Sequence, residues 1–450
     1  MSVLTLKFTN ESQLPDSEVY FGFVPGSTTD SFEISYIPDV LAPVQEAVKP
    51  LNTAKGPGNW YRYDQLKNGV EITHFSGRIY VSYGQTWEVL DAYYEPAQNV
   101  TDANFFLRYD KMELTFNGKT TDVADLTSID YWSIPMKLET SIDGIPVASD
   151  QGIKNGVDSL DIYKALRNLT LNTPSGLAQA KPALVPGSFQ QHKDQKGKGF
   201  ARIIGPSSYP ALNGIPEIPY HVFDSYLAFL YEHFGGEQAL PISGVTIPGL
   251  GNGVMAFIKG HFAGVGPNVP PTGPQSAQEY DLKGTITKET AGYVVSLSGT
   301  VGSDSVKMVF TQAELTNPAG IYGANAQFTL EVNGVSKGTI APANDVYGWV
   351  SGDLLAGFNI GALGSIVQIS NEYVGAMKSS DWFQKIPNTE LFGALQSNAA
   401  FYNQYAAALQ SKSDAYNFAY SDRFDAVQIS LNPEKVNTLE LTVMNVTTEG

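Results

Sequence analysis

The sequence of 450 residues contains no cysteine. Disulfide-stapled folds, zinc–thiolate sites and cysteine nucleophiles are therefore excluded. Basic residues are also scarce, because 28 Lys and Arg stand against 45 Asp and Glu and leave a formal net charge of −17 at pH 7. Nucleic-acid binding needs a Lys/Arg surface that neutralises phosphates, so we expect no nucleic-acid partner. Uncharged or cationic ligands suit this composition better.

Long apolar runs are missing as well. The most apolar stretch, residues 354–369, contains Asn359, Gln368 and three glycines, and it is too short and too polar for a membrane span. We expect it to be a buried helix or a pair of strands, and we expect no membrane association. Residues 1–10 alternate as a β-strand does and do not resemble the apolar core of a signal peptide.

Turn-forming residues are abundant. The chain has 43 glycines and 26 prolines, and the dipeptide Asn-Gly, which favours type I′ hairpin turns, begins at Asn68, Asn117, Asn155, Asn213, Asn252 and Asn333. Between such turns, residues 1–150 show short alternating or aromatic segments and no long helical period. Since 42% of all residues are hydrophobic and 12% aromatic, large cores can form. This region is predicted to be an all-β barrel or sandwich.

The pattern changes after residue 150. Apolar residues recur at helical spacing over residues 159–169, 217–234 and 390–409, whereas residues 280–340 return to strand pairs. The C-terminal segments 426–431 and 438–443 again alternate as strands. We therefore expect a mainly β protein with a barrel domain over 1–150, completed by strands within 425–450, a mixed α/β domain over 151–424, and a wide groove between them.

Several familiar motifs carry little weight. Gly334-Val-Ser336-Lys-Gly338 matches the nucleophile-elbow pattern of serine hydrolases, but it follows Asn333 in a hairpin turn and no helix comes after it. The five histidines, His74, His192, His221, His233 and His261, form no metal-binding motif. We therefore expect neither a metal site nor a cofactor.

Two carboxylates stand out in residues 108–138, with Glu113 inside one predicted strand and Asp130 at the start of the next. A pairing of Phe116 with Thr127 would set Glu113 opposite Asp130, whereas a tight turn at Asn117 would set it opposite Asp122. Two carboxyl groups about 6.5–9.5 Å apart are the catalytic pair of inverting glycosidases. The ordinary alternative is a solvated face of surface carboxylates.

Family-like motifs occur in three segments of this region: GRIYVSYG, LRYDKMELTFNG and DLTSIDYWSIPMKL. They resemble the barrel domain of glycoside hydrolase family 64, the β-1,3-glucanases that release laminaripentaose, and they are also similar to thaumatin-like proteins with their acidic cleft. VYGWVSGDLLAGFNIGAL and FYNQYAAALQSKSDAYNFAYSDRF resemble the mixed domain of family 64. The lack of cysteine and the helical middle favour family 64 over the disulfide-rich, shorter thaumatin-like proteins. One departure is that AYNFAYSD stands where AYGFPYDD is expected, so Ala419 replaces Pro and Ser421 replaces Asp.

The resemblance implies a general acid at Glu113 and a general base at Asp130. It also matches Arg108 and Asp125 to the Arg and an Asp of the acidic cleft. Sugars bind on flat aromatic rings, and the predicted substrate-binding residues are Arg108, Asp125, Tyr131, Trp132, Trp349 and Tyr402.

The resulting expectation is a monomeric, secreted enzyme that cleaves β-1,3-glucan by inversion, needs no cofactor, and has a signal peptide that this chain does not include. A cytoplasmic location stays open, because the lack of cysteine suits the cytosol equally well. The alternatives are a non-catalytic β-glucan-binding protein with the same groove and a structural or surface-layer protein.

Overall fold

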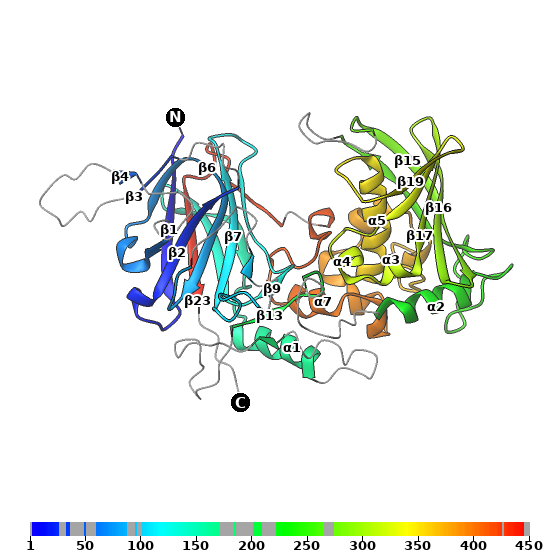
Figure 1. The fold of residues 1–450 in the computed structure, drawn as a ribbon, viewed down its shortest axis with the longest axis horizontal. Coiled ribbons are helices and arrows are strands. Elements are labelled where there is room, and N and C mark those ends of the chain that lie inside the picture. The colour runs from blue at the N-terminus through cyan, green and yellow to red at the C-terminus, as the bar shows by residue number, and fades with distance from the viewer. Residues whose placement is uncertain are drawn as a thin grey trace, which may run out of the picture.

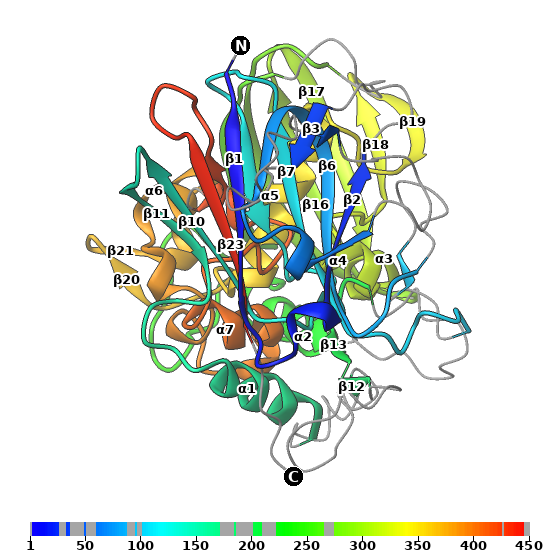
Figure 2. The ribbon, with the colours of Figure 1, turned by 90° about the vertical axis from the view of Figure 1, so that its left-hand side faces the viewer.

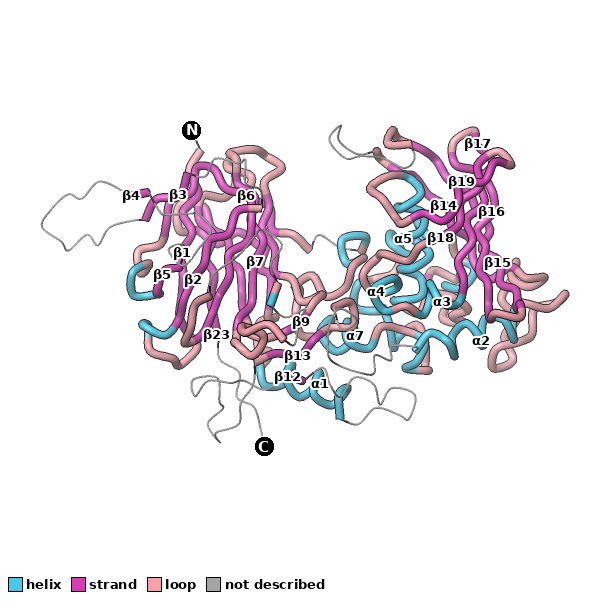
Figure 3. The backbone as a smooth tube through the Cα atoms, viewed as in Figure 1, coloured by secondary structure: helices cyan, strands magenta, loops and turns pink. Residues whose placement is uncertain are grey.

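The computed structural model describes residues 2–26, 33–36, 49–50, 60–87, 95–96, 101–171, 184–185, 201–208, 222–264, 274–424 and 427–444. These residues form two lobes that lie side by side (Figure 1). The first lobe is almost entirely strands, and the second combines a β-sheet with helices (Figure 3). The predicted fold class, mainly β with a mixed α/β part, is confirmed.

The first lobe is built on a 12-stranded sheet whose long strand β6 (Val70–Tyr83) joins its two halves. The start of β6 pairs with β1 (Leu4–Glu11), and its later residues pair with β2 (Val19–Pro25) and β7 (Tyr109–Phe116). The other strands of this sheet are β3 (Glu33–Tyr36), β4 (Lys49–Pro50), β5 (Trp60–Arg62), β8 (Val123–Leu126), β10 (Met136–Ile142), β11 (Ile145–Gly152), β22 (Ile429–Ser430) and β23 (Thr438–Met444).

Strand β23 lies in the interior of this sheet although it comes from the C-terminal end of the chain (Figure 2). It runs parallel to β1 on one side and antiparallel to β10 on the other. Leu441 is opposite Phe8 in β1 and Leu138 in β10, and all three side chains are buried. The first and last strands of the chain therefore share one hydrophobic core.

The second lobe contains a six-stranded antiparallel sheet in which each strand pairs with the next one along the chain. Its strands are β14 (Val254–Phe262), β15 (Gln278–Glu289), β16 (Gly292–Val301), β17 (Asp304–Thr311), β18 (Phe328–Val332) and β19 (Val335–Ile340). The helices of this lobe are α2 (Val222–Phe234), α3 (Gln312–Thr316), α4 (Pro318–Ile321), α5 (Val346–Ile360) and α6 (Ser379–Lys385). A two-stranded ribbon, β20 (Gln368–Ile369) and β21 (Glu372–Tyr373), completes it.

Helix α5 contains the first part of the apolar segment 354–369, residues 354–360. It begins at Asp345, whose carboxylate accepts hydrogen bonds from the backbone N–H groups of Tyr347 and Gly348, and it ends at Gly361, which has a left-handed conformation. Almost all of its side chains are buried in the core of the second lobe. Among the described residues, no helix is both long and apolar enough to cross a membrane.

The prediction of one helix over residues 390–409 is wrong. Three short 3-10 turns interrupt this range, and only α7 (Gln404–Gln410) is an α-helix. Phe392 has a φ of 59°, which a continuous α-helix cannot contain. Asn403 accepts a hydrogen bond from the N–H of Ala406 and so begins α7.

A small three-stranded sheet and two helices lie at the lower junction of the lobes (Figure 1). The sheet contains β12 (Leu184–Val185), β13 (Arg202–Ile204) and β9 (Tyr131–Trp132), and α1 (Ser159–Leu171) packs against α7. The returning chain also forms a bridge between Tyr416 and Thr127, directly after β8. The segment that contains Asp130 is thus held from several sides.

Candidate active site

One face of strands β6, β7 and β8 carries a row of charged side chains. Because side chains alternate along a strand, Met112 and Leu114 of β7 point into the core, and Lys111 and Glu113 point to the opposite face. Glu113 pairs with Arg78 in β6 and with Asp125 in β8. A cation, a carboxyl group and a second carboxyl group therefore stand side by side across three strands.

The predicted registers of this hairpin are both wrong, since Glu113 is opposite neither Asp130 nor Asp122. The connection between β7 and β8 is closed by Asp122, whose buried carboxylate accepts hydrogen bonds at 2.7 Å from the N–H groups of Asn117 and Lys119. The loop therefore extends to Asp122, and β8 starts at Val123, opposite Thr115. This register places Asp125 opposite Glu113.

Glu113 reaches solvent while its position is held by an ion pair. Its carboxylate Oε1 lies 3.1 Å from Arg78 Nε, and 46% of its side chain is exposed. Arg78 is itself partly buried, so its guanidinium group is fixed against the sheet. Glu113 is therefore accessible to a ligand on this face.

Asp125 differs from Glu113 because it is buried. Burial and, next, the negative charge of Glu113 raise the pKa of Asp125 from 3.8 to about 7, although a hydrogen bond from Gln428 acts in the other direction. Below neutral pH Asp125 thus holds a proton beside the Glu113 carboxyl group.

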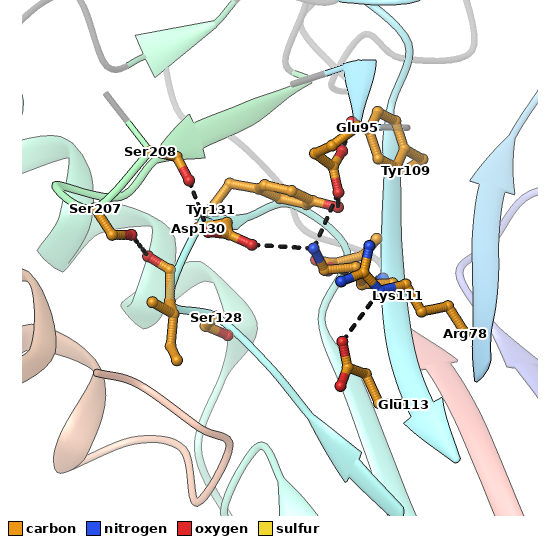
Figure 4. A network of polar contacts seen from close by, with 12 residues as sticks. Arg78, Glu95, Tyr109, Lys111, Glu113, Ser128, Asp130, Tyr131, Ser207 and Ser208 are labelled. Carbon is orange, nitrogen blue, oxygen red and sulfur yellow. Dashed lines mark hydrogen bonds and ion pairs between the residues drawn. The ribbon is translucent and has the colours of Figure 1, made fainter. Parts of the chain in front are cut away.

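Asp130 reaches the same region from the segment between β8 and β9. Its Oδ2 lies 3.0 Å from Lys111 Nζ, and its Oδ1 accepts a hydrogen bond of 2.7 Å from the Ser208 hydroxyl (Figure 4). Burial alone would raise the pKa of Asp130, but the charge of Lys111 and these hydrogen bonds hold it below its ordinary value. Asp130 is therefore ionised over the physiological pH range, with 31% of its side chain exposed.

The backbone of Asp130 is clamped by residues 205–208. Gly205 N–H donates to the carbonyl of Asp130, and the Ser207 hydroxyl donates to the carbonyl of Ile129, both at 2.7 Å. A Cβ atom on Gly205 would lie 2.3 Å from the Ile129 carbonyl oxygen, so this close approach requires glycine. The clamp fixes the point from which the Asp130 side chain extends.

Asp110, which lies on the core side of β7, holds the chain just after Asp130. Its carboxylate accepts hydrogen bonds from the N–H groups of Ser133 and Ile134 at 3.1 and 3.0 Å. Burial raises the pKa of Asp110 to about 7, although these backbone donors act against that effect. Strand β7 thus anchors the Asp130 segment from both of its faces.

Three further predicted substrate-binding residues are buried more deeply than Asp125 and present no surface to a sugar. Arg108 lies on the core side, with its guanidinium 5.4 Å from the centroid of the Tyr83 ring. Tyr131 and Trp132 belong to the aromatic core beneath the site. Strand alternation and the small β9–β13 sheet turn these side chains inward, so they support the site from behind.

Trp349 and Tyr402 belong to the second lobe. Trp349 is partly exposed, but the guanidinium of Arg423 lies 4.0 Å from the centroid of its ring, and the Phe262 ring lies nearby. Tyr402 is half-buried beside Phe392. The structure therefore brings together Glu113, Asp125 and Asp130 on the first lobe, whereas these two aromatic residues lie on the other lobe.

Sequence reasoning missed four polar residues of this site: Arg78, Glu95, Lys111 and Ser208. Lys111 precedes Glu113 by two positions, and strand alternation could have placed it on the same face. Glu95 and Ser208 gave no local signal, because only tertiary folding brings them close. Among the described residues no group of His, Asp and Glu could hold a metal ion, and His192 and His221 lie outside that set.

Comparison with known proteins finds a matching family model and similar folds. Residues 61–254 match the model of glycoside hydrolase family 64, described as β-1,3-glucanase. The match contains all three carboxylates, Glu113, Asp125 and Asp130. The comparison with curated proteins gives no match.

Two crystal structures share the fold over nearly the whole chain. One is a laminaripentaose-producing β-1,3-glucanase in complex with laminaritetraose, at 16% identity, a TM-score of 0.53 and 99% coverage of both chains. The other is a family 64 β-1,3-glucanase domain from Clostridium beijerinckii, at 14% identity, a TM-score of 0.50 and 98% coverage of both chains. Residues 61–254 therefore resemble glycoside hydrolase family 64, and the fold of the chain is similar to that of these two structures.

Proposed function

We propose that this protein hydrolyses β-1,3-glucan with inversion of the anomeric configuration, with Glu113 as the general acid and Asp130 as the general base. The match of residues 61–254 to a β-1,3-glucanase family model supports the reaction and the substrate. The observation that carries the residue assignment is the separate support of two carboxyl groups on one face of the barrel lobe, Glu113 by Arg78 and Asp130 by Lys111.

The spacing of the two supports suits this chemistry. Lys111 and Glu113 are two residues apart on one strand, which is about 6.4–6.8 Å along the chain. Asp130 is bound to the ammonium group of Lys111, whose backbone lies two residues before Glu113 on the same strand. An inverting glycosidase needs ~6.5–9.5 Å between its carboxyl groups to admit a water molecule.

Each carboxyl group is suited to one role. Asp130 is ionised and can accept a proton from a water molecule that attacks the anomeric carbon. Glu113 is exposed and can donate a proton to the glycosidic oxygen while the bond from that oxygen to the anomeric carbon breaks. Water enters from the face opposite the departing sugar, so a β-linkage yields an α-anomer.

The remaining assignments belong to the same proposal. Asp125 contacts the substrate next to Glu113, and Trp349 and Tyr402 contact sugar units further along a groove between a barrel domain (1–150 with 425–450) and a mixed domain (151–424). The protein acts outside the cell as a monomer. It takes a β-1,3-glucan chain as the complexed family member takes laminaritetraose.

The test is hydrolysis of laminarin by the wild type and by Glu113→Gln and Asp130→Asn. Each variant should lose about 10²–10⁴-fold in kcat, because a positioned acid or base is removed while the side-chain shape is kept. Glu139→Gln is the matched control, since Glu139 is a half-exposed strand residue paired with Lys137 away from this face. Proton NMR at early times should show the α-anomer first.

Three results would contradict the proposal. An active Asp130→Asn variant would remove the base from the mechanism, and early release of the β-anomer would exclude inversion. A wild-type protein that binds laminarin without cutting it would instead be a glucan-binding protein.

A further inference from the structure

We propose that Lys111 is a positioning residue that holds the Asp130 carboxylate, in its ionised form, at a fixed distance from Glu113, with Glu95 as its counter-ion. This inference rests on the proposed function, because it assigns a task to the group that supports the proposed base. Neither the sequence motifs nor the family resemblance pointed to Lys111 or Glu95.

The ammonium group of Lys111 is enclosed in the protein. The side chains of Lys111 and Glu95 are each only 3% exposed, and Lys111 Nζ lies 3.0 Å from Glu95 Oε2 and 3.0 Å from Asp130 Oδ2 (Figure 4). The same Nζ lies 5.3 Å from the centroid of the Tyr131 ring. A buried ammonium ion is costly unless it is paired, so its location is determined by these partners.

Glu95 is held in place independently of Lys111. The Tyr109 hydroxyl donates a hydrogen bond to Glu95 Oε1, and the Tyr131 hydroxyl lies 3.5 Å from Oε2. Tyr109 is on β7, and Tyr131 directly follows Asp130. The buried Glu95–Lys111 pair is therefore a rigid element, and Asp130 at the partly exposed edge is positioned against it.

Strand β7 links the buried Glu95–Lys111 pair to Glu113, so that the pair and the strand together connect the two proposed catalytic groups. Lys111 and Glu113 share one face of β7 because they are two residues apart. The 3.0 Å contact between Lys111 Nζ and Asp130 Oδ2 ties the Asp130 carboxylate to the strand that carries Glu113. Lys111 thus sets the room available for the attacking water molecule.

The charges explain why a second carboxylate is needed. A lysine bound to Asp130 alone would neutralise the base, whereas Lys111 divides its charge between Glu95 and Asp130. The groups that face Asp130 are Lys111 and Arg78 from the strands and Ser208 from the clamp; those that face Lys111 are Glu95, Asp130, Tyr80 and Arg78. Lys111 is the cation in direct contact with the Asp130 carboxylate.

The test compares two substitutions with opposite expected effects. Lys111→Met removes the cation, so the acidic limb of the kcat/KM profile should move to higher pH by about one unit or more, and kcat at its optimum should fall ~10–100-fold. Glu95→Gln leaves Lys111 bound to Asp130 alone, so the acidic limb should move to lower pH. A purely structural role would lower stability in both variants and leave the shape of the profile unchanged.

A direct readout does not depend on turnover. In protein labelled with ¹³C at the aspartate carboxyl carbon, the signal missing from Asp130→Asn identifies Asp130, and its titration should move upward in Lys111→Met and downward in Glu95→Gln. Lys137→Met is the control, because Lys137 forms an ion pair with Glu139 on β10 that is more exposed and does not involve Asp130. It should change neither the titration nor the activity profile.

A folding defect in Lys111→Met would be separated from the positional effect by the double variant Lys111→Met/Glu95→Gln. This variant removes both buried charges and leaves no unpaired ion, so it should fold, and it should still show the upward shift of Asp130. An unchanged Asp130 titration in the folded variants would overturn the role of Lys111. Full activity of Asp130→Asn would overturn the proposed function instead, so the two failures are distinguishable.

Discussion

Glu113 and Asp125 stand directly opposite each other in the antiparallel pairing of β7 and β8. Directly opposed side chains on one face of a sheet lie about 4.5–5.5 Å apart at their Cβ atoms, so the two carboxyl groups are neighbours. Arg78 neutralises Glu113 from the other side, whereas Asp125 is buried and keeps its proton to about pH 7. This row therefore places a proton-bearing carboxyl group directly beside the exposed carboxyl group of Glu113.

The first prediction concerns Asp125→Asn and the pH dependence of stability. The pKa of Asp125 is 3.8 ordinarily and about 7 in the folded protein, so the folded state binds more protons between these values. The favourable contribution of Asp125 is therefore present below about pH 4 and lost as the pH rises through 7. At pH 8 Asp125→Asn should therefore be more stable than the wild type, with a free energy of unfolding higher by an amount on the order of 2–4 kcal/mol.

At pH 4 the two proteins should have equal thermal midpoints. Asp110, whose pKa is also about 7, contributes equally to the pH dependence of stability in both proteins, so its contribution cancels in the comparison. A constant difference in midpoint between pH 4 and pH 8 would show that Asp125 is ionised throughout.

The second prediction is that Asp122→Ala is a stability variant. Asp122 accepts two backbone hydrogen bonds in a buried loop, and their loss should cost about 1–3 kcal/mol per unsatisfied group. The kcat on laminarin of the folded fraction should stay near that of the wild type. Asp143→Ala, at an exposed turn, is the matched control for stability, and a tenfold loss of kcat in Asp122→Ala would place Asp122 in the active site after all.

The third prediction concerns the buried ion pair of the second lobe. Asp353 is fully buried, accepts hydrogen bonds from Tyr280 and Ser379 at 2.7 and 2.6 Å, and pairs with Arg423. Arg423→Met should cost about 3–5 kcal/mol because it leaves an uncompensated buried carboxylate. Chemical denaturation measures this loss.

The double variant Arg423→Met/Asp353→Asn should recover part of that stability. Arg62→Met is the control, since Arg62 forms an exposed pair with Asp64 that should contribute no more than about 1 kcal/mol. Equal effects of Arg423→Met and Arg62→Met would show that Asp353 is neutral in the folded protein.

The fourth prediction concerns chelation. The proposed proton transfers need only the two carboxyl groups and water, so laminarin hydrolysis should continue at an unchanged rate after dialysis against EDTA. Loss of activity that added Ca²⁺ or Mg²⁺ restores would assign a metal to the reaction.

Local signals in the sequence were sufficient for much of the fold. The Asn333–Gly334 turn was predicted from its dipeptide, and both residues have the positive φ that a type I′ turn requires. The same reasoning predicted that Ser336 is not a catalytic nucleophile, and Ser336 does lie in the β18–β19 hairpin. Residues 354–360, which form the second half of α5, were also predicted to be buried, and they are.

The candidate site was predicted less completely because it depends on contacts between distant residues. The register of β7 and β8 is set by the Asp122 side chain, which turn propensity at Asn117 does not reveal. Glu95 and Ser208 reach Lys111 and Asp130 from far along the chain. The inward orientation of Trp132 likewise depends on its pairing with Ile203.

The interior position of β23 has a consequence for biosynthesis. During translation the ribosome releases β1 and β10 long before Thr438–Met444, yet in the described part of the sheet β23 is the strand that lies between these two and pairs with both. The sheet of the first lobe therefore stays incomplete between β1 and β10 until β23 has been synthesised. The six strands of the second lobe each pair with the next one along the chain, so that sheet can form earlier. The order of completion along this chain is the reverse of the order of synthesis, and premature termination would affect the lobe that was made first.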